Sequence, residues 1–151
     1  MQYLIATTFE VVHYIALQAV HYKPLQEVHL SRYNQFSAGG NIVYNVALDH
    51  DELSRPDFLG MIYPAWFEAE VPEDPMPLFI AASQGEAAST NFFGDTPALY
   101  TAWNKTRQPC EIHSFTNAMH GFGYRSNGRT ENIWTTLFYN FLDNCKMLNK
   151  K

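Results

Sequence analysis

The sequence has little positive charge, little cysteine and no long uninterrupted hydrophobic run. Its ten lysines and arginines are outnumbered by 15 acidic residues, which gives a formal net charge of -5. A polyanion would find no basic surface here, so no nucleic-acid partner is expected. Every apolar run falls far short of the roughly 20 residues that span a bilayer, so no membrane partner is expected either. The two cysteines, Cys110 and Cys145, cannot build a disulfide framework and lack the spacing of a zinc or redox site.

The composition predicts one globular domain over residues 1–151. Hydrophobic residues make up 46% of the chain and charged residues 17%, which is enough apolar material for a sizeable core. Glu10 and His13 lie where an export signal would need an uninterrupted apolar stretch. We therefore expect a cytoplasmic protein.

Strand-like and helix-like segments alternate along the chain. Short β-prone or continuously apolar runs predict strands, and apolar residues at helical spacing predict helices between them. The predicted strands cover 28–36, 58–63, 78–82 and 110–115, and the predicted helices cover 11–20, 42–47, 95–103 and 133–145. This alternation predicts an α/β domain with a mainly parallel sheet of about four strands and helices on both faces.

Two further segments carry specific expectations. Residues 67–77 hold four acids and three prolines, which predicts an irregular, solvated connection. The last helix has a continuous apolar stripe, which predicts that one face is buried in the core. Its members are Ile133, Trp134, Leu137, Phe138, Phe141, Leu142 and Cys145.

A serine occupies the turn between the first strong strand and its helix. The sequence Gln35-Phe-Ser-Ala-Gly39 would hold the hydroxyl of Ser37 above the sheet edge, at the start of a helix. This geometry suits a nucleophile, and the backbone N–H of Ala38 would face an oxyanion formed on Ser37. A plain glycine-containing turn between strand and helix explains the same five residues and stays open as the alternative.

A serine nucleophile needs a base and an acid. His120 follows the last predicted strand in a glycine-rich loop, which suits a general base. The acid that orients this histidine is expected after the penultimate strand, where Glu86 is the nearest carboxylate. Asp95 is the second candidate, although Thr96 and Pro97 behind it also fit a helix N-cap.

Other chemistries are poorly supported. His13, His21 and His29 cannot share one helix face, because Pro24 interrupts the segment and no carboxylate follows in a ligand pattern. A phosphate cradle would need a further glycine pattern with a lysine or a ribose-binding acid. We therefore expect no metal and no cofactor.

Several ordered motifs resemble the α/β-hydrolase esterases, within them the acetyl-esterase and acetylxylan- or feruloyl-esterase-like group. Phe36-Ser-Ala-Gly-Gly40 resembles their nucleophile elbow, Arg55–Phe58 with Ile62–Pro64 resembles the next strand, and Met119–Gly123 resembles the catalytic-histidine loop. The resemblance covers about Ala16 to Asp143. It implies a truncated α/β-hydrolase fold, because the family has several strands before its elbow and this chain has only 36 residues there.

The resemblance implies a serine esterase acting on small-molecule esters. Ser37 would be the nucleophile, His120 the general base and the Ala38 N–H one oxyanion donor, with short acyl or acetyl esters, including those on carbohydrate, as substrates. The alternative is a catalytically inactive relative that acts as a binding or interaction module. Gln35, where the family has glycine, and the short segment before Ser37 favour that alternative.

The elbow strand is also expected to lie at the edge of the sheet. An uncovered edge exposes N–H and C=O groups and adjoining apolar surface, which favours association. Either the β-prone segment Gln2–Thr8 or a second copy of the chain would cover it, and we expect a homo-oligomer.

Overall fold

The computed structural model describes residues 32–36, 38–64, 68–84, 95–124 and 127–148. Its elements alternate in the order expected for an α/β domain. They are β1 (Arg32–Phe36), α2 (Ala38–Leu48), β2 (Phe58–Ile62), β3 (Leu78–Ser83), α4 (Asp95–Asn104), β4 (Cys110–Phe115), the 3-10 helix η2 (Thr130–Ile133) and α5 (Trp134–Asn144). The segments predicted over 2–8 and 11–20 lie outside the described residues.

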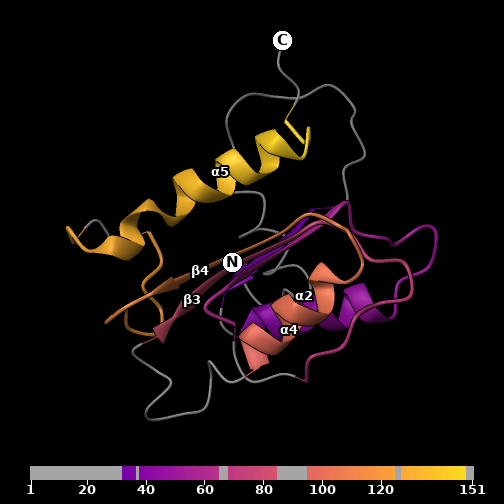
Figure 1. The fold of residues 1–151 in the computed structure, drawn as a ribbon, viewed down its shortest axis with the longest axis horizontal. Coiled ribbons are helices and arrows are strands. Elements are labelled where there is room, and N and C mark those ends of the chain that lie inside the picture. Colours follow the sequence, from indigo (N-terminus) through magenta and orange to yellow (C-terminus); the bar gives the residue numbers. More distant parts are fainter. Residues whose placement is uncertain (1–31, 37, 65–67, 85–94, 125–126, 149–151) are drawn as a thin grey trace, which may run out of the picture.

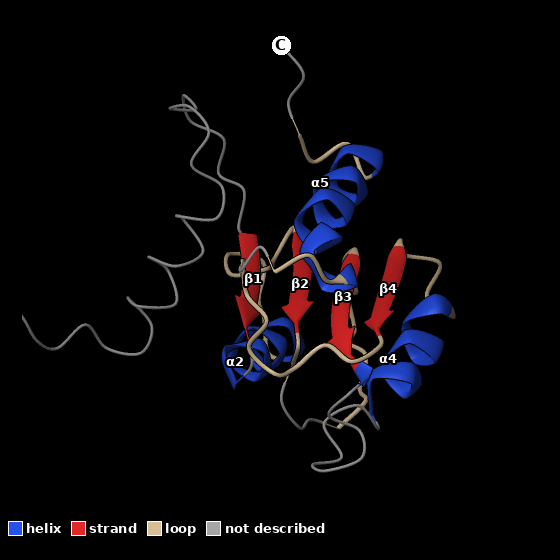
Figure 2. Cartoon of the chain, turned by 90° about the vertical axis from the view of Figure 1, so that its left-hand side faces the viewer, coloured by secondary structure: helices blue, strands red, loops and turns tan. Residues whose placement is uncertain are grey.

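The four strands form one parallel sheet in the order β1-β2-β3-β4. Figure 2 shows them side by side, pointing the same way. Gln35 pairs with Met61, and Ile80 pairs with Ile112. Among the described strands, β1 has a neighbour on one side only, as expected for the elbow strand. The carboxyl ends of all four strands therefore meet at one edge of the sheet.

Both faces of the sheet are buried. Because side chains alternate along a strand, Leu59 and Met61 of β2 pack toward α2 and α4, while Phe58 and Ile62 pack toward α5. Figure 1 shows α5 on one side of the sheet and α2 and α4 on the other. The predicted parallel α/β architecture is confirmed, and the continuous apolar runs are explained by this two-sided burial.

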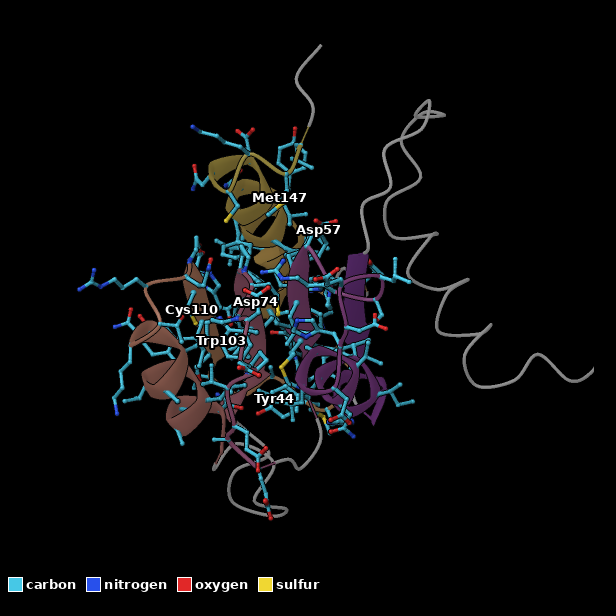
Figure 3. All side chains as sticks on the ribbon, turned by 90° about the vertical axis from the view of Figure 1, so that its right-hand side faces the viewer. Tyr44, Asp57, Asp74, Trp103, Cys110 and Met147 are labelled. Carbon is cyan, nitrogen blue, oxygen red and sulfur yellow. The ribbon has the colours of Figure 1, made fainter. Side chains whose placement is uncertain are left out.

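The connection between β2 and β3 is irregular, as expected, but it is not wholly solvated. Met76 is fully buried, and the indole N–H of Trp103 donates a hydrogen bond to its carbonyl oxygen at 2.7 Å. The hydroxyl of Tyr44 donates to the carbonyl oxygen of Glu68 at 3.0 Å. Tyr44 and Trp103 belong to the layer of α2 and α4 (Figure 3). The connection is thus held against one face of the sheet.

The predicted stripe of the last helix is correct apart from its first residue. Trp134, Phe138, Phe141 and Leu142 are buried, and Cys145 is half-buried against them. Ile133 is 55% exposed and is the last residue of η2, directly before α5. A 3-10 helix has about 3.0 residues per turn where an α-helix has 3.6, so the apolar phase of α5 does not extend back through it.

Candidate active site

The serine turn has the expected strand, turn and helix around it. β1 ends at Phe36 and α2 begins at Ala38, so a single residue, Ser37, separates them. Ser37 itself lies outside the described residues, and its role stays a prediction. The N–H of Ala38 is among the first four of α2, which have no acceptor within the helix. Its proposed oxyanion role is therefore compatible with the backbone.

The two candidate acids are not tested by the structure. Glu86 follows Gln84, at the end of β3, and lies outside the described residues. Asp95 is the first residue of α4, and its side chain is likewise not described. Both acids follow β3, the next-to-last strand of the sheet, so the strand order does not choose between them.

His120 lies in the loop after β4, at the carboxyl edge of the sheet. The side chain of His120 is exposed, whereas Ala118 and Phe122, two residues to either side, are buried. These two residues pack in the core layer under α5 and so attach the loop to it. The loop therefore presents an accessible imidazole from a backbone that is held on both sides.

Two bonds from the end of β3 hold the beginning of this loop. The buried hydroxyl of Ser83 donates a short hydrogen bond to the carbonyl oxygen of Ala118. The hydroxyl of Thr116 donates to the side-chain oxygen of Gln84 at 2.9 Å. These bonds therefore tie the loop to the end of a buried interior strand.

The far end of the loop is held by α5. The indole N–H of Trp134 donates a hydrogen bond to the carbonyl oxygen of Gly123 at 2.8 Å, and the ring of Tyr124 packs on Trp134 at 5.2 Å between centroids. Gly121 and Gly123 have φ angles of 74° and 51°, a conformation that disfavours residues with a Cβ. The glycines that mark this loop in the sequence therefore suit its backbone.

Tyr63 is a site residue that the sequence reasoning missed. It follows β2 directly, is 8% exposed, and packs edge-on against the ring of His120 with centroids 5.3 Å apart. Its φ of 38° is unusual for an aromatic residue. The only sequence signal was a Tyr-Pro pair at the end of a buried strand, which by itself indicates a strand end.

The described cysteines do not offer an alternative nucleophile. Burial and the neighbouring Glu111 carboxylate raise the pKa of the Cys110 thiol to about 12. Burial also raises the pKa of Cys145, with a further contribution from Glu111. Both thiols stay protonated near neutral pH, and a protonated thiol is a poor nucleophile.

Within the described ranges, no three His, Cys, Asp or Glu side chains gather in a way that could hold a metal ion. Over the same ranges, no helix has both the length and the apolar character needed to cross a membrane.

Solved structures similar to this chain are esterases and other α/β hydrolases. Apo Thermogutta terrifontis esterase 2 superimposes with a TM-score of 0.55 over 77% of this chain, at 18% sequence identity. A sugar hydrolase, YeeB, from Lactococcus lactis superimposes with a TM-score of 0.58 over 74% of this chain, at 16% identity. MGS-M1, an α/β hydrolase from a Medee basin deep-sea metagenome library, gives a TM-score of 0.53 over 75%, at 21% identity.

The chain has the α/β-hydrolase fold. The matches cover 56% of the Thermogutta esterase, 56% of YeeB and 53% of MGS-M1, so this chain spans little more than half the length of those proteins. No family model matches the sequence, and no curated protein matches it. The expectation of an α/β-hydrolase fold is thus confirmed by structure.

Proposed function

We propose that this chain is a serine hydrolase that cleaves short-chain acyl or acetyl esters through an acyl-enzyme. The observation that carries the proposal is the histidine loop, whose fixed backbone presents an exposed imidazole at the carboxyl edge of an α/β-hydrolase sheet. β1 ends at the same edge, and Ser37 is the next residue in the chain. In open α/β sheets this edge is where ligands bind.

The proposed reaction proceeds in two halves. The Ser37 hydroxyl oxygen attacks the ester carbonyl carbon while His120 accepts the hydroxyl proton, and the Ala38 N–H donates to the resulting oxyanion. The bond to the alcohol then breaks, and the alcohol leaves with the proton from His120. Water attacks the acyl-enzyme in the same way, which releases the acid and returns the proton to Ser37. Glu86 would hold the tautomer of His120 and stabilise the imidazolium.

The choice of short acyl groups has support from one neighbour. Structures of Thermogutta terrifontis esterase 2 include propionate-bound and butyrate-bound forms. The same esterase has been described phosphoramylated by tabun and phosphonylated by cyclosarin, which recommends an organophosphorus probe for the present chain.

The decisive experiment is labelling with a fluorophosphonate, read by intact mass. An activated serine forms a bond to phosphorus and releases fluoride, so wild type should gain one adduct. Ser37→Ala and His120→Ala should gain none, whereas the exposed β4 serine variant Ser114→Ala should label as wild type. Hydrolysis of p-nitrophenyl acetate should follow the same pattern. A folded wild type that takes no label would contradict the proposal and favour an inactive binding module.

The acid of the proposed triad is Glu86. Replacing Glu86 and Asp95 in turn by the corresponding amide tests which of the two carboxylates has this role. If Glu86 orients His120, Glu86→Gln should lower kcat by about ten-thousandfold, as loss of the triad acid does elsewhere. Asp95→Asn serves as the matched control and should keep most of the activity. The reverse result would assign the role to Asp95.

We further propose that a second copy of the chain pairs with β1 on the side that β2 does not occupy. A parallel or antiparallel strand from a partner would satisfy the backbone groups of β1 that β2 does not pair. Light scattering should then give at least a dimer at micromolar concentration, and a monomer would refute this part of the proposal.

A further inference from the structure

Tyr63 and His120 are far apart in the sequence but lie with their rings in contact. Tyr63 follows the carboxyl end of β2, and His120 follows the carboxyl end of β4. Their ring centroids are 5.3 Å apart, and the ring planes are inclined by 66°. Edge-to-face packing of this kind is a preferred geometry for aromatic rings.

The ring of Tyr63 is held from behind by the core. Phe122 packs against it at 4.6 Å between centroids with an interplanar angle of 75°, and Phe115 packs against Phe122 at 5.9 Å. All three aromatic side chains are buried. The ring of Tyr63 that contacts His120 is therefore the end of a series of edge-to-face aromatic contacts in the core layer under α5.

The backbone of Tyr63 is fixed as well. Its N–H donates to the carbonyl oxygen of Ala81 on β3 at 2.6 Å, and its φ of 38° lies in the left-handed region. A non-glycine residue persists in this region when the surrounding structure determines its conformation, and such residues cluster at functional sites. The hydroxyl of Tyr63 lies beside Gly123, on the same loop as His120.

We infer that Tyr63 is a positioning residue that sets the orientation of the His120 imidazole. An exposed loop histidine can adopt several side-chain rotamers, and a fixed ring against one side of it restricts that choice. The catalytic consequence rests on the proposed function, in which His120 moves the proton of Ser37. Misplacement of a catalytic group by about 1 Å can lower the rate about a hundredfold.

Proton NMR tests the contact without reference to activity. In wild type, the ring protons of His120, assigned by comparison with His120→Ala, should show nuclear Overhauser contacts to the Tyr63 ring. The ring-current shift of the His120 protons should persist in Tyr63→Phe and disappear in Tyr63→Leu. Absence of the contact in folded wild type would overturn the inference, even if Tyr63→Leu failed to fold.

Kinetics test the consequence. Tyr63→Leu should lower kcat for p-nitrophenyl acetate by about 10- to 100-fold with little change in KM, and Tyr63→Phe should restore it. Tyr44→Leu is the matched control, because Tyr44 is equally buried but belongs to the layer on the opposite face of the sheet. Equal losses of kcat in the two leucine variants would overturn the inference in favour of a general packing effect.

Failure of the inference and failure of the proposed function are distinguishable. A wild type that takes no fluorophosphonate refutes the serine hydrolase, and the NMR contact still decides whether Tyr63 orients His120. A labelled wild type whose Tyr63→Leu variant keeps its kcat refutes the positioning role and leaves the hydrolase intact.

Discussion

Removal of one hydroxyl, that of Ser83, should loosen the histidine loop. The Ser83 side chain is 5% exposed and donates to the carbonyl oxygen of Ala118, a residue that is 1% exposed. In Ser83→Ala that oxygen loses its partner in a site closed to water. A buried acceptor left unpaired costs about 1–3 kcal/mol. In a domain of this size each kcal/mol lowers the Tm by about 2–4 °C, so the expected fall is roughly 2–12 °C.

The assay for Ser83→Ala is thermal unfolding followed by circular dichroism, with Ser114→Ala as the control. Ser114 is the exposed serine of the adjacent strand β4, and its substitution should change stability by less than about 0.5 kcal/mol. Because the loop carries His120, the rate of fluorophosphonate labelling should also fall in Ser83→Ala and not in the control. Equal stability of the two variants would refute the claim that the Ser83 bond holds the loop.

Other predictions concern the thiols, one ion pair and one buried acid. Cys110 and Cys145, whose pKa values are raised by burial, should react with thiol reagents in the folded protein at pH 8 far more slowly than in urea. A hydrogen bond from Arg55 lowers the pKa of Asp74 from its usual value of 3.8. The ionised Asp74 therefore stabilises the folded protein at pH values above 3.8, and this stabilisation is lost as the pH falls through the lowered pKa. Arg55→Gln should raise the Asp74 midpoint toward 3.8 in an NMR titration and start acid unfolding at higher pH. Glu131 is 1% exposed, and among the described residues its Oε2 finds no hydrogen-bond partner. Glu131→Met should therefore raise the free energy of unfolding by about 1 kcal/mol. A lower free energy of unfolding in urea titration would contradict this.

The sheet was predictable because each of its strands carries a local signal. Residues 58–62 and 78–82 are continuous apolar runs because helices cover both faces of the sheet, so that each position of the strand is buried. The turn between β1 and α2 was also predictable, because Ser37 and two glycines follow a β-prone segment, although Gly39 and Gly40 lie in the first turn of α2. Periodicity and turn chemistry act over a few residues, so the sequence alone was enough for them.

Two predictions failed, one at a change of helix type and one in a loop that is held by residues distant in the sequence. Ile133 continues the apolar spacing of α5 but belongs to a 3-10 helix, and the change of helix type cannot be deduced from hydrophobic pattern. The acid-rich connection before β3 looked fully solvated, yet Tyr44 and Trp103 bond its backbone from two separate helices. Such bonds join residues more than 20 positions apart, and neither partner is marked in its own neighbourhood.

The candidate site shows the same difference between what local sequence signals predict and what long-range contacts determine. Chain order was enough to predict His120 after the last strand, because parallel strands bring their carboxyl ends to one edge. What fixes the histidine is different: Ser83 from β3, Tyr63 after β2 and Trp134 from α5 each contact its loop or its ring. Each of these elements contributes buried residues to the core layer under α5. The geometry of the imidazole therefore depends on the packing of that whole layer, and under the proposed function substitutions there should alter turnover even where they touch no substrate.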